Sequence, residues 1–179
     1  GLESSNNEDL IMFSDPDEIP NPEKLRNLEL KKKFGIFFQK MYTYKLNLFN
    51  KYESPWEGTR ICKKKDLKSI DWLRHKVLHK NLKYGFWRFD KEKSIQIIND
   101  GGWHFNYLLK PEDIARKFKS LAETSWDKEE YYNEDNIKKK IEEKKDLFNR
   151  GHIFEKIELD EAYPLYLQKN KRKYSEWII

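Results

Sequence analysis

Two carboxylates stand two residues apart near the start of the chain, at Asp15 and Asp17. They follow a short apolar run, Leu10 to Phe13, which predicts a buried central strand that ends in an acidic loop. In such a loop the two carboxylates can converge on one hard cation, Mg²⁺ or Mn²⁺. A cation held there would stabilise a departing diphosphate. Because Asp-x-Asp also arises by chance in acidic loops, the motif depends on its context.

A second group of candidate residues is the run Asp100-Gly101-Gly102-Trp103-His104. The glycines predict a turn between strands at 95–98 and 103–108, or a close approach of the backbone to a ligand. An indole can stack on a sugar face. An imidazole can bind a metal, donate to phosphate or act as a base. The alternative is a tight hairpin whose second strand is an aromatic core strand.

Trp56 and Arg60 form the third group, in the run Trp56-Glu57-Gly58-Thr59-Arg60. The guanidinium of Arg60 can pair with a phosphate or a carboxylate, and Trp56 can line a sugar pocket. The alternative is an ordinary loop with a surface arginine.

Periodicity predicts the elements that carry these groups. Asn21-Pro22-Glu23 predicts a capped helix start, because Asn caps well, Pro suits the first helical position and an acid suits the first turn. Further predicted elements are strands at 36–46 and 59–62, and helices at 21–30, 70–81, 134–148 and 164–177. Another helix begins at Pro111, with Ile114, Phe118, Leu121 and Ala122 on one face.

Composition limits the class of protein. The 179 residues are 37% charged and 15% aromatic, so a few large rings must supply much of the core. The net charge of +5 is compatible with a nucleic-acid-binding module, but most lysines alternate with glutamates, as on a solvated helix face. The single cysteine excludes an intrachain disulfide. No apolar run reaches the ~20 residues that span a bilayer.

The three groups occur in an order that resembles glycosyltransferase family 17, the family of the β-1,4-mannosyl-glycoprotein 4-β-N-acetylglucosaminyltransferase. The residues that carry the resemblance are 14–20, then Trp56-x-Gly58-Thr59-Arg60, then 100–105. The run 146–150, Asp-Leu-Phe-Asn-Arg, and Tyr163-Pro164-x-Tyr166 resemble the C-terminal portion of that family. The likeness covers nearly the whole chain from about Leu10.

The resemblance implies an α/β protein of the GT-A type, a Rossmann-like fold, with a mixed sheet followed by helices. It implies an inverting transfer of a sugar, with N-acetylglucosamine from UDP-GlcNAc the first candidate, to a glycan acceptor in β-1,4 linkage. A divalent cation, Mn²⁺ or Mg²⁺, would bind at Asp15 and Asp17. The candidate catalytic residues are Asp100, Glu18 and His104; the candidate substrate-binding residues are Trp56, Arg60, Gly101, Gly102 and Trp103. We expect Trp103 and His104 to lie near the two aspartates, with His104 within about 15 Å of them.

GT-A enzymes place strands that hold the nucleotide base before the Asp-x-Asp strand, and only nine residues precede Leu10. We therefore expect residues 1–179 to be one partial catalytic domain without its N-terminal half, with reduced or no activity as an isolated fragment. We also expect an unpaired apolar sheet edge that self-associates. The expected location is the cytoplasm for a bacterial or viral type, or the Golgi lumen for a eukaryotic relative. The competing classes are a nucleic-acid-binding module and a non-catalytic remnant of the fold.

Overall fold

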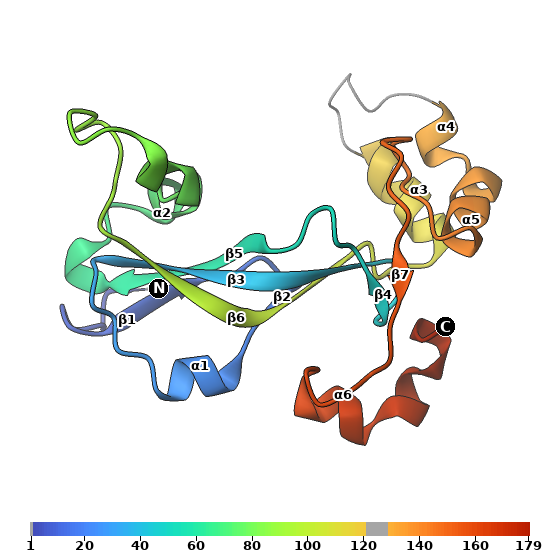
Figure 1. Ribbon diagram of the computed structural model, residues 1–179, viewed down its shortest axis with the longest axis horizontal. Coiled ribbons are helices and arrows are strands. Elements are labelled where there is room, and N and C mark those ends of the chain that lie inside the picture. The colour runs from blue at the N-terminus through green and yellow to red at the C-terminus, as the bar shows by residue number, and fades with distance from the viewer. Residues whose placement is uncertain (1, 121–128) are drawn as a thin grey trace. The chain divides into compact units, whose positions relative to one another are not determined.

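The computed structural model describes residues 2–120 and 129–179, which form a mixed α/β fold with a mixed β-sheet followed by helices (Figure 1). The chain divides into two compact units. Unit 1 comprises the residues up to Lys40 and Pro55–His104, and unit 2 comprises Met41–Ser54 and Phe105–Ile179. Within the described residues, no helix is both long enough and apolar enough to cross a membrane.

Unit 1 is built on a sheet whose strands lie in the order β1, β5, β3, β6, β2. Their bounds are β1 Leu10–Phe13, β5 Trp56–Lys63, β3 Phe34–Thr43, β6 Ile95–Asn106 and β2 Glu18–Pro20, and β3 and β6 also contribute their last residues to unit 2. The pairs β1/β5, β3/β5 and β2/β6 are antiparallel. β3 and β6 run in the same direction, because Phe34 N donates to Ser94 O and Tyr44 N donates to Asn106 O, each at 3.0 Å.

Strand β3 is the central strand of unit 1, and its alternate side chains enter two apolar clusters. One cluster packs under helix α2, Ile70–Lys76, and contains Phe34, Ile36, Cys62, Leu73, Val77 and Ile95. The other contains Phe37, Ile61 and Ile98, with Leu25, Leu28 and Leu30 from helix α1, Pro22–Arg26, and the segment after it. Figure 1 shows α1 and α2 on opposite faces of the sheet. A strand covered on both faces is expected to be mostly apolar, as β3 is over residues 34–38.

The prediction that Leu10–Phe13 is a buried central strand was wrong. β1 lies at an edge of the described sheet and pairs with β5, from Leu10 opposite Lys63 to Phe13 opposite Arg60. Ile11 is buried, whereas Leu10 and Met12 are exposed. Because strand side chains alternate between faces, a run of four apolar residues does not establish that both faces are covered. Self-association through this edge stays a prediction.

The predicted turn at 99–102 is also absent, since these residues lie within the continuous strand β6. The hydrogen bonds Phe34 N to Ser94 O and Tyr44 N to Asn106 O are ten residues apart along β3 but twelve residues apart along β6. The extra residues form a bulge at which Asp100 has φ 51° and Gly102 has φ 139°. A Cβ on Gly101 would lie 2.9 Å from Phe37 Cα, and one on Gly102 would lie 2.1 Å from Ile19 O. The glycines therefore let strands β3 and β2 approach β6 closely.

The predicted helix starts were more accurate than the predicted ends. Asn21 caps α1 by accepting from Glu23 N at 3.0 Å, but the helix ends at Arg26. The helix predicted at 70–81 divides into α2 and a 3₁₀ segment, His79–Lys83. The helix predicted at 164–177 divides into α6, Leu165–Lys169, and a 3₁₀ segment, Lys171–Trp177.

Unit 2 packs its helices against Tyr44 and Tyr107, which directly follow β3 and β6. It also contains the short strands β4, Leu48–Phe49, and β7, Glu155–Lys156. The helices are α3 Pro111–Ser120, α4 Glu129–Tyr132 and α5 Glu134–Glu142, the last of which is shorter than predicted. The core contains Tyr44, Leu48, Ile114, Ala115, Phe118, Ile137, Leu147 and Phe154. Ile114 and Phe118 thus share the predicted buried face, whereas Leu121 and Ala122 lie outside the described residues.

Candidate functional site

Glu18 and His104 lie directly opposite each other in the antiparallel pair β2/β6. Opposite residues of such a pair project from the same face, so the carboxylate and the imidazole are neighbours. Glu18 is 7% exposed and His104 is 6% exposed, which is unusual for ionisable side chains. The register of a three-residue strand thus brings together two motifs that are far apart in the sequence.

Trp56, from the start of β5, completes this buried group. Its Nε1–H donates to Glu18 Oε1 at 2.8 Å, and its ring meets the His104 ring edge to face at 4.9 Å. Asp15 N donates to Glu18 Oε2 at 3.3 Å. Burial raises the pKa of Glu18 above its usual range, although the hydrogen bonds from Trp56 and Asp15 N oppose the shift. Glu18 therefore holds a proton more readily than an exposed glutamate does.

The two nitrogens of His104 have different surroundings. Nε2 lies 3.3 Å from Asp17 Oδ2, and the Asp17 side chain is partly exposed. Nδ1 is buried and has no hydrogen-bond partner in the described part of the chain. When Nε2 carries the proton and donates to Asp17, Nδ1 offers a lone pair. A buried polar atom without a protein partner is costly, so Nδ1 is suited to a ligand hydroxyl or a water. The predicted proximity of His104 to the aspartates is confirmed.

The two aspartates of the Asp-x-Asp motif have different partners. Asp15 Oδ2 accepts from Arg74 Nη2 at 2.9 Å, whereas Asp17 faces His104. Arg74 lies on α2, and its guanidinium also lies 5.4 Å from the centre of the Phe13 ring. Arg74 was not predicted from the sequence, because a basic residue on an exposed helix face carries no signal of its distant partner.

The carboxylates near the site offer few ligands for a divalent cation. Within the described residues no group of three or more His, Cys, Asp or Glu side chains could hold a metal. A cation at Asp15 or Asp17 would therefore rest on one or two carboxylates and take its other ligands from a diphosphate and water. Mg²⁺ is commonly held in this way.

A buried chain of polar side chains supports the loop that carries the aspartates. Gln39 Nε2 donates to Thr59 Oγ1 at 3.1 Å, and Thr59 Oγ1 lies 2.7 Å from Ser14 Oγ. Ser14 Oγ in turn donates to Glu18 O at 3.2 Å. Gly58 leaves the space that Gln39 fills, since a Cβ there would lie 2.1 Å from Gln39 Oε1. Gln39, which directly follows the apolar residues 34–38 of β3, is the signal that could have revealed this support.

Arg60, which was expected to pair with a phosphate or a carboxylate, binds backbone carbonyls in the structure. Its guanidinium is buried and donates to the carbonyls of Val77, Glu57 and Gly58, at 3.2, 3.0 and 2.6 Å. Burial lowers the pKa of Arg60, and the nearby carboxylates of Glu18, Glu57 and Asp15 oppose that shift. In this arrangement Arg60 braces the backbone beside the site.

The remaining predicted site residues lie along β6. Gly101 and Gly102 contact neighbouring strands of the same unit, as described above. Trp103 lies opposite Ile19 in the pair β2/β6. Successive strand residues point to alternate faces of a sheet, so the side chain of Trp103 lies on the face opposite to that of His104. Asp100 is exposed, and its carbonyl accepts from Asn21 Nδ2 at 3.2 Å. Among the described contacts, none joins Asp100 to Glu18 or His104.

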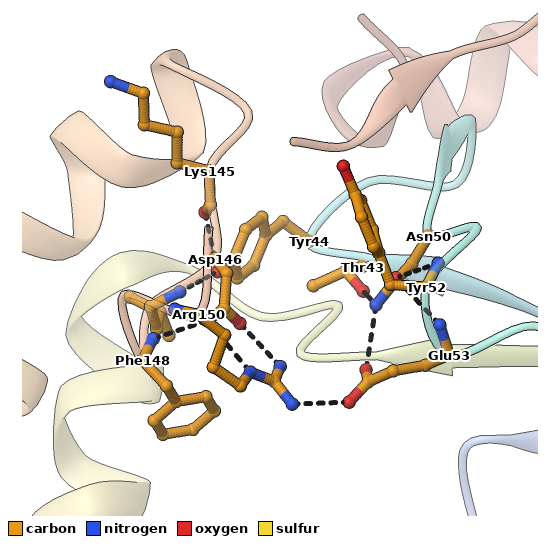
Figure 2. A network of polar contacts seen from close by, with 10 residues as sticks. Thr43, Tyr44, Asn50, Tyr52, Glu53, Lys145, Asp146, Phe148 and Arg150 are labelled. Atoms are coloured by element: carbon orange, nitrogen blue, oxygen red, sulfur yellow. Dashed lines mark hydrogen bonds and ion pairs between the residues drawn. The ribbon is translucent and has the colours of Figure 1, made fainter. Parts of the chain in front are cut away.

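A second polar network lies in unit 2, in the run 146–150 that contributed to the family resemblance (Figure 2). Asp146 Oδ2 accepts from Arg150 Nε at 3.0 Å, and Oδ1 accepts from Arg150 Nη2 at 2.6 Å. Arg150 Nη1 donates to Glu53 Oε1 at 2.7 Å. Oδ2 of Asp146 also accepts from the backbone N–H groups of Phe148 and Arg150, each at 3.1 Å. The network ties two loops of unit 2 together.

The Asp146→Asn variant is expected to lower the free energy of unfolding by about 2–3 kcal/mol at neutral pH. The amide cannot receive both guanidinium bonds, and Arg150 would keep only Glu53 as a carboxylate partner among the described residues. The partial exposure of Arg150 keeps the loss below that of a fully buried pair. Burial raises the pKa of Asp146, but its hydrogen bonds from Arg150 outweigh this and leave the pKa below its usual value. The carboxylate therefore stabilises the fold above the unfolded pKa of about 4, and this contribution disappears as the pH falls through the folded pKa.

Urea denaturation at neutral and at acidic pH measures this difference. The difference in free energy of unfolding between wild type and Asp146→Asn should become smaller at acidic pH. Arg150→Lys, which keeps the charge but loses the two-point geometry, should have a smaller effect. If this difference in free energy of unfolding does not change with pH, the ion pair between Asp146 and Arg150 is not its cause.

No family model, no curated protein and no solved structure matches this chain. The class that the fold defines is a mixed α/β protein, and the function is therefore a proposal.

Proposed function

We propose that unit 1 carries the active site of an inverting glycosyltransferase that uses a nucleotide-sugar donor. The observation that supports this most strongly is the joining of Asp17, His104, Glu18 and Trp56, which come from three separate motifs, in one partly buried group. The same three motifs carry the resemblance to glycosyltransferase family 17. UDP-GlcNAc is the first donor to test, with a glycan acceptor and a β-1,4 product.

In the proposed reaction the acceptor hydroxyl attacks the anomeric carbon, the new C–O bond forms and the bond to the diphosphate breaks. The hydroxyl proton passes to a base within hydrogen-bond reach. The two candidates for this base are Glu18, whose carboxylate is buried, and His104, whose Nδ1 has a lone pair when Nε2 donates to Asp17. Trp56 would orient Glu18 through its indole N–H. Asp15 and Asp17 would hold a divalent cation, which neutralises charge on the departing diphosphate.

The first experiment measures donor binding by calorimetry and sugar release from UDP-GlcNAc and other UDP-sugars, with Mn²⁺ or Mg²⁺ and with EDTA. We expect donor binding and turnover to require the cation, because without it the carboxylates of Asp15 and Asp17 would repel the diphosphate. Full turnover in EDTA would contradict the cation role. A folded chain that binds no UDP-sugar with the cation present would contradict the proposal and favour a non-catalytic remnant of the fold.

A further inference from the structure

Three large aromatic side chains of unit 1 lie close together in the sequence and are exposed to water. Phe86 is 81% exposed, Trp87 is 65% exposed and Phe89 is 91% exposed. They belong to an aromatic loop, residues 84–91, that precedes β6. Single exposed apolar residues are ordinary, but a group of exposed rings indicates a surface that meets a partner. The Glu18–His104 group does not include them.

The aromatic loop is ordered by its own backbone and polar side chains. Arg88 N, Phe89 N and Lys91 N donate to carbonyls two or three residues earlier, at 3.0–3.2 Å. The Arg88 guanidinium makes two bonds of 2.7 Å to Asp90 and lies 5.2 Å from the centre of the Tyr84 ring. The backbone is thus fixed while the largest side chains remain in water. Such an arrangement lowers the entropy cost of docking.

Positive charge accompanies the rings. A pocket of about 490 Å³ is lined by Phe89 and Trp72 together with Lys68, Lys76, Lys80 and Lys91. Its acidic lining residues are Asp90 and Glu92, and Asp90 is already paired with Arg88 and Lys91. The pocket therefore has an excess of cations next to an exposed phenyl ring, which suits an anion attached to an apolar body.

We propose that the aromatic loop docks on a membrane surface containing anionic phospholipids. Phe86, Trp87 and Phe89 enter the boundary between headgroups and acyl chains, and the lysine-lined pocket receives a lipid phosphate. Aromatic residues beside lysines are the usual composition of surfaces that bind such interfaces.

A single-stranded nucleic acid fits the loop less well. Bases stack on flat ring faces beside cations that follow the phosphates. Here the Phe86 and Trp87 rings meet at 76° with centres 5.3 Å apart, and Arg88 is held by Asp90. The rings therefore form an apolar projection and not a stacking platform.

Sedimentation of the full chain with vesicles tests the proposal. Vesicles of phosphatidylcholine with phosphatidylglycerol should bind the chain at least about tenfold more tightly than phosphatidylcholine alone, with binding weakened by salt. Replacing Phe86, Trp87 and Phe89 together by serine should lower the partition coefficient about 100-fold or more, because the buried ring area is lost. The double variant Lys76→Glu and Lys80→Glu should lose the preference for the anionic vesicles.

Matched variants distinguish binding through the aromatic loop from nonspecific adsorption of exposed apolar residues to vesicles. Serine at Ile153 and Leu165, which are also exposed apolar residues, should leave vesicle binding unchanged. Trp87→Phe should bind nearly as well as wild type but lose most of the lipid-induced blue shift of tryptophan emission. The proposal is overturned if the wild type binds neither kind of vesicle, or binds both equally well. It is also overturned if the triple serine variant binds the anionic vesicles as tightly as the wild type. Loop-dependent binding of a single-stranded oligonucleotide without vesicle binding would also overturn it.

Discussion

Replacing Asp17 with asparagine is expected to slow sugar transfer by a factor of about 10² to 10⁴, the range that a lost acid–base function usually costs. Asp17 Oδ2 lies 3.3 Å from Nε2 of the buried His104 ring. The carboxylate favours a proton on Nε2 and so leaves Nδ1 able to accept one. An amide can donate to Nε2, which would place the proton on Nδ1 and remove that lone pair. The same substitution also removes a proposed cation ligand.

Stability should change little in this variant, because the Asp17 side chain is partly exposed. The matched control is Asp9→Asn, which alters an exposed aspartate of the same unit that accepts from a nearby backbone N–H. Initial rates and denaturant unfolding should be measured for both. Equal rates for Asp17→Asn and Asp9→Asn, at equal stability, would remove Asp17 and its contact with His104 from the mechanism.

Gly102→Ala is expected to lower the free energy of unfolding by about 3–5 kcal/mol, through the combined cost of backbone strain and overpacking. Gly102 has φ 139°, a conformation that residues with a Cβ rarely adopt. An added Cβ would lie 2.1 Å from the carbonyl oxygen of Ile19 in β2. Relief requires β2 to move away from β6, which would separate Glu18 from His104. Donor binding should therefore fall together with stability.

Gly151→Ala is the matched control. Gly151 also has a positive φ, 78°, but a Cβ there would meet nothing within 4 Å. We expect a loss of about 1–2 kcal/mol, from strain alone. Both variants can be compared by urea denaturation followed by circular dichroism. A similar cost for the two would show that the close approach of β2 to β6 is not what Gly102 permits.

Local features were predictable from the sequence because the interactions that create them are local. Asn21, Pro22 and Glu23 define the start of α1 through a cap that spans two residues. The apolar density of 36–46 predicted β3, whose side chains supply both clusters of unit 1. Helix ends were less predictable, since the chain after Glu142 turns where Lys144 takes φ 56°, which no composition signal marks.

Strand neighbours were decided only by the tertiary structure. An apolar run such as Leu10–Phe13 does not specify whether one or both of its faces are covered, and it became an edge strand. Paired glycines permit either a turn or a close approach, and the packing of β2 and β3 against β6 selected the second.

The sequence alone determined which side chains are available for chemistry, and the order of three motifs led to the expectation that His104 lies near the aspartates. The pairing of Glu18 with His104, the link from Asp15 to Arg74 and the use of Arg60 on backbone carbonyls came only with the fold. Hydrogen bonds reach about 3 Å, so the partner of each side chain depends on strand register and helix placement. Those are properties of the whole packed unit and not of any one motif.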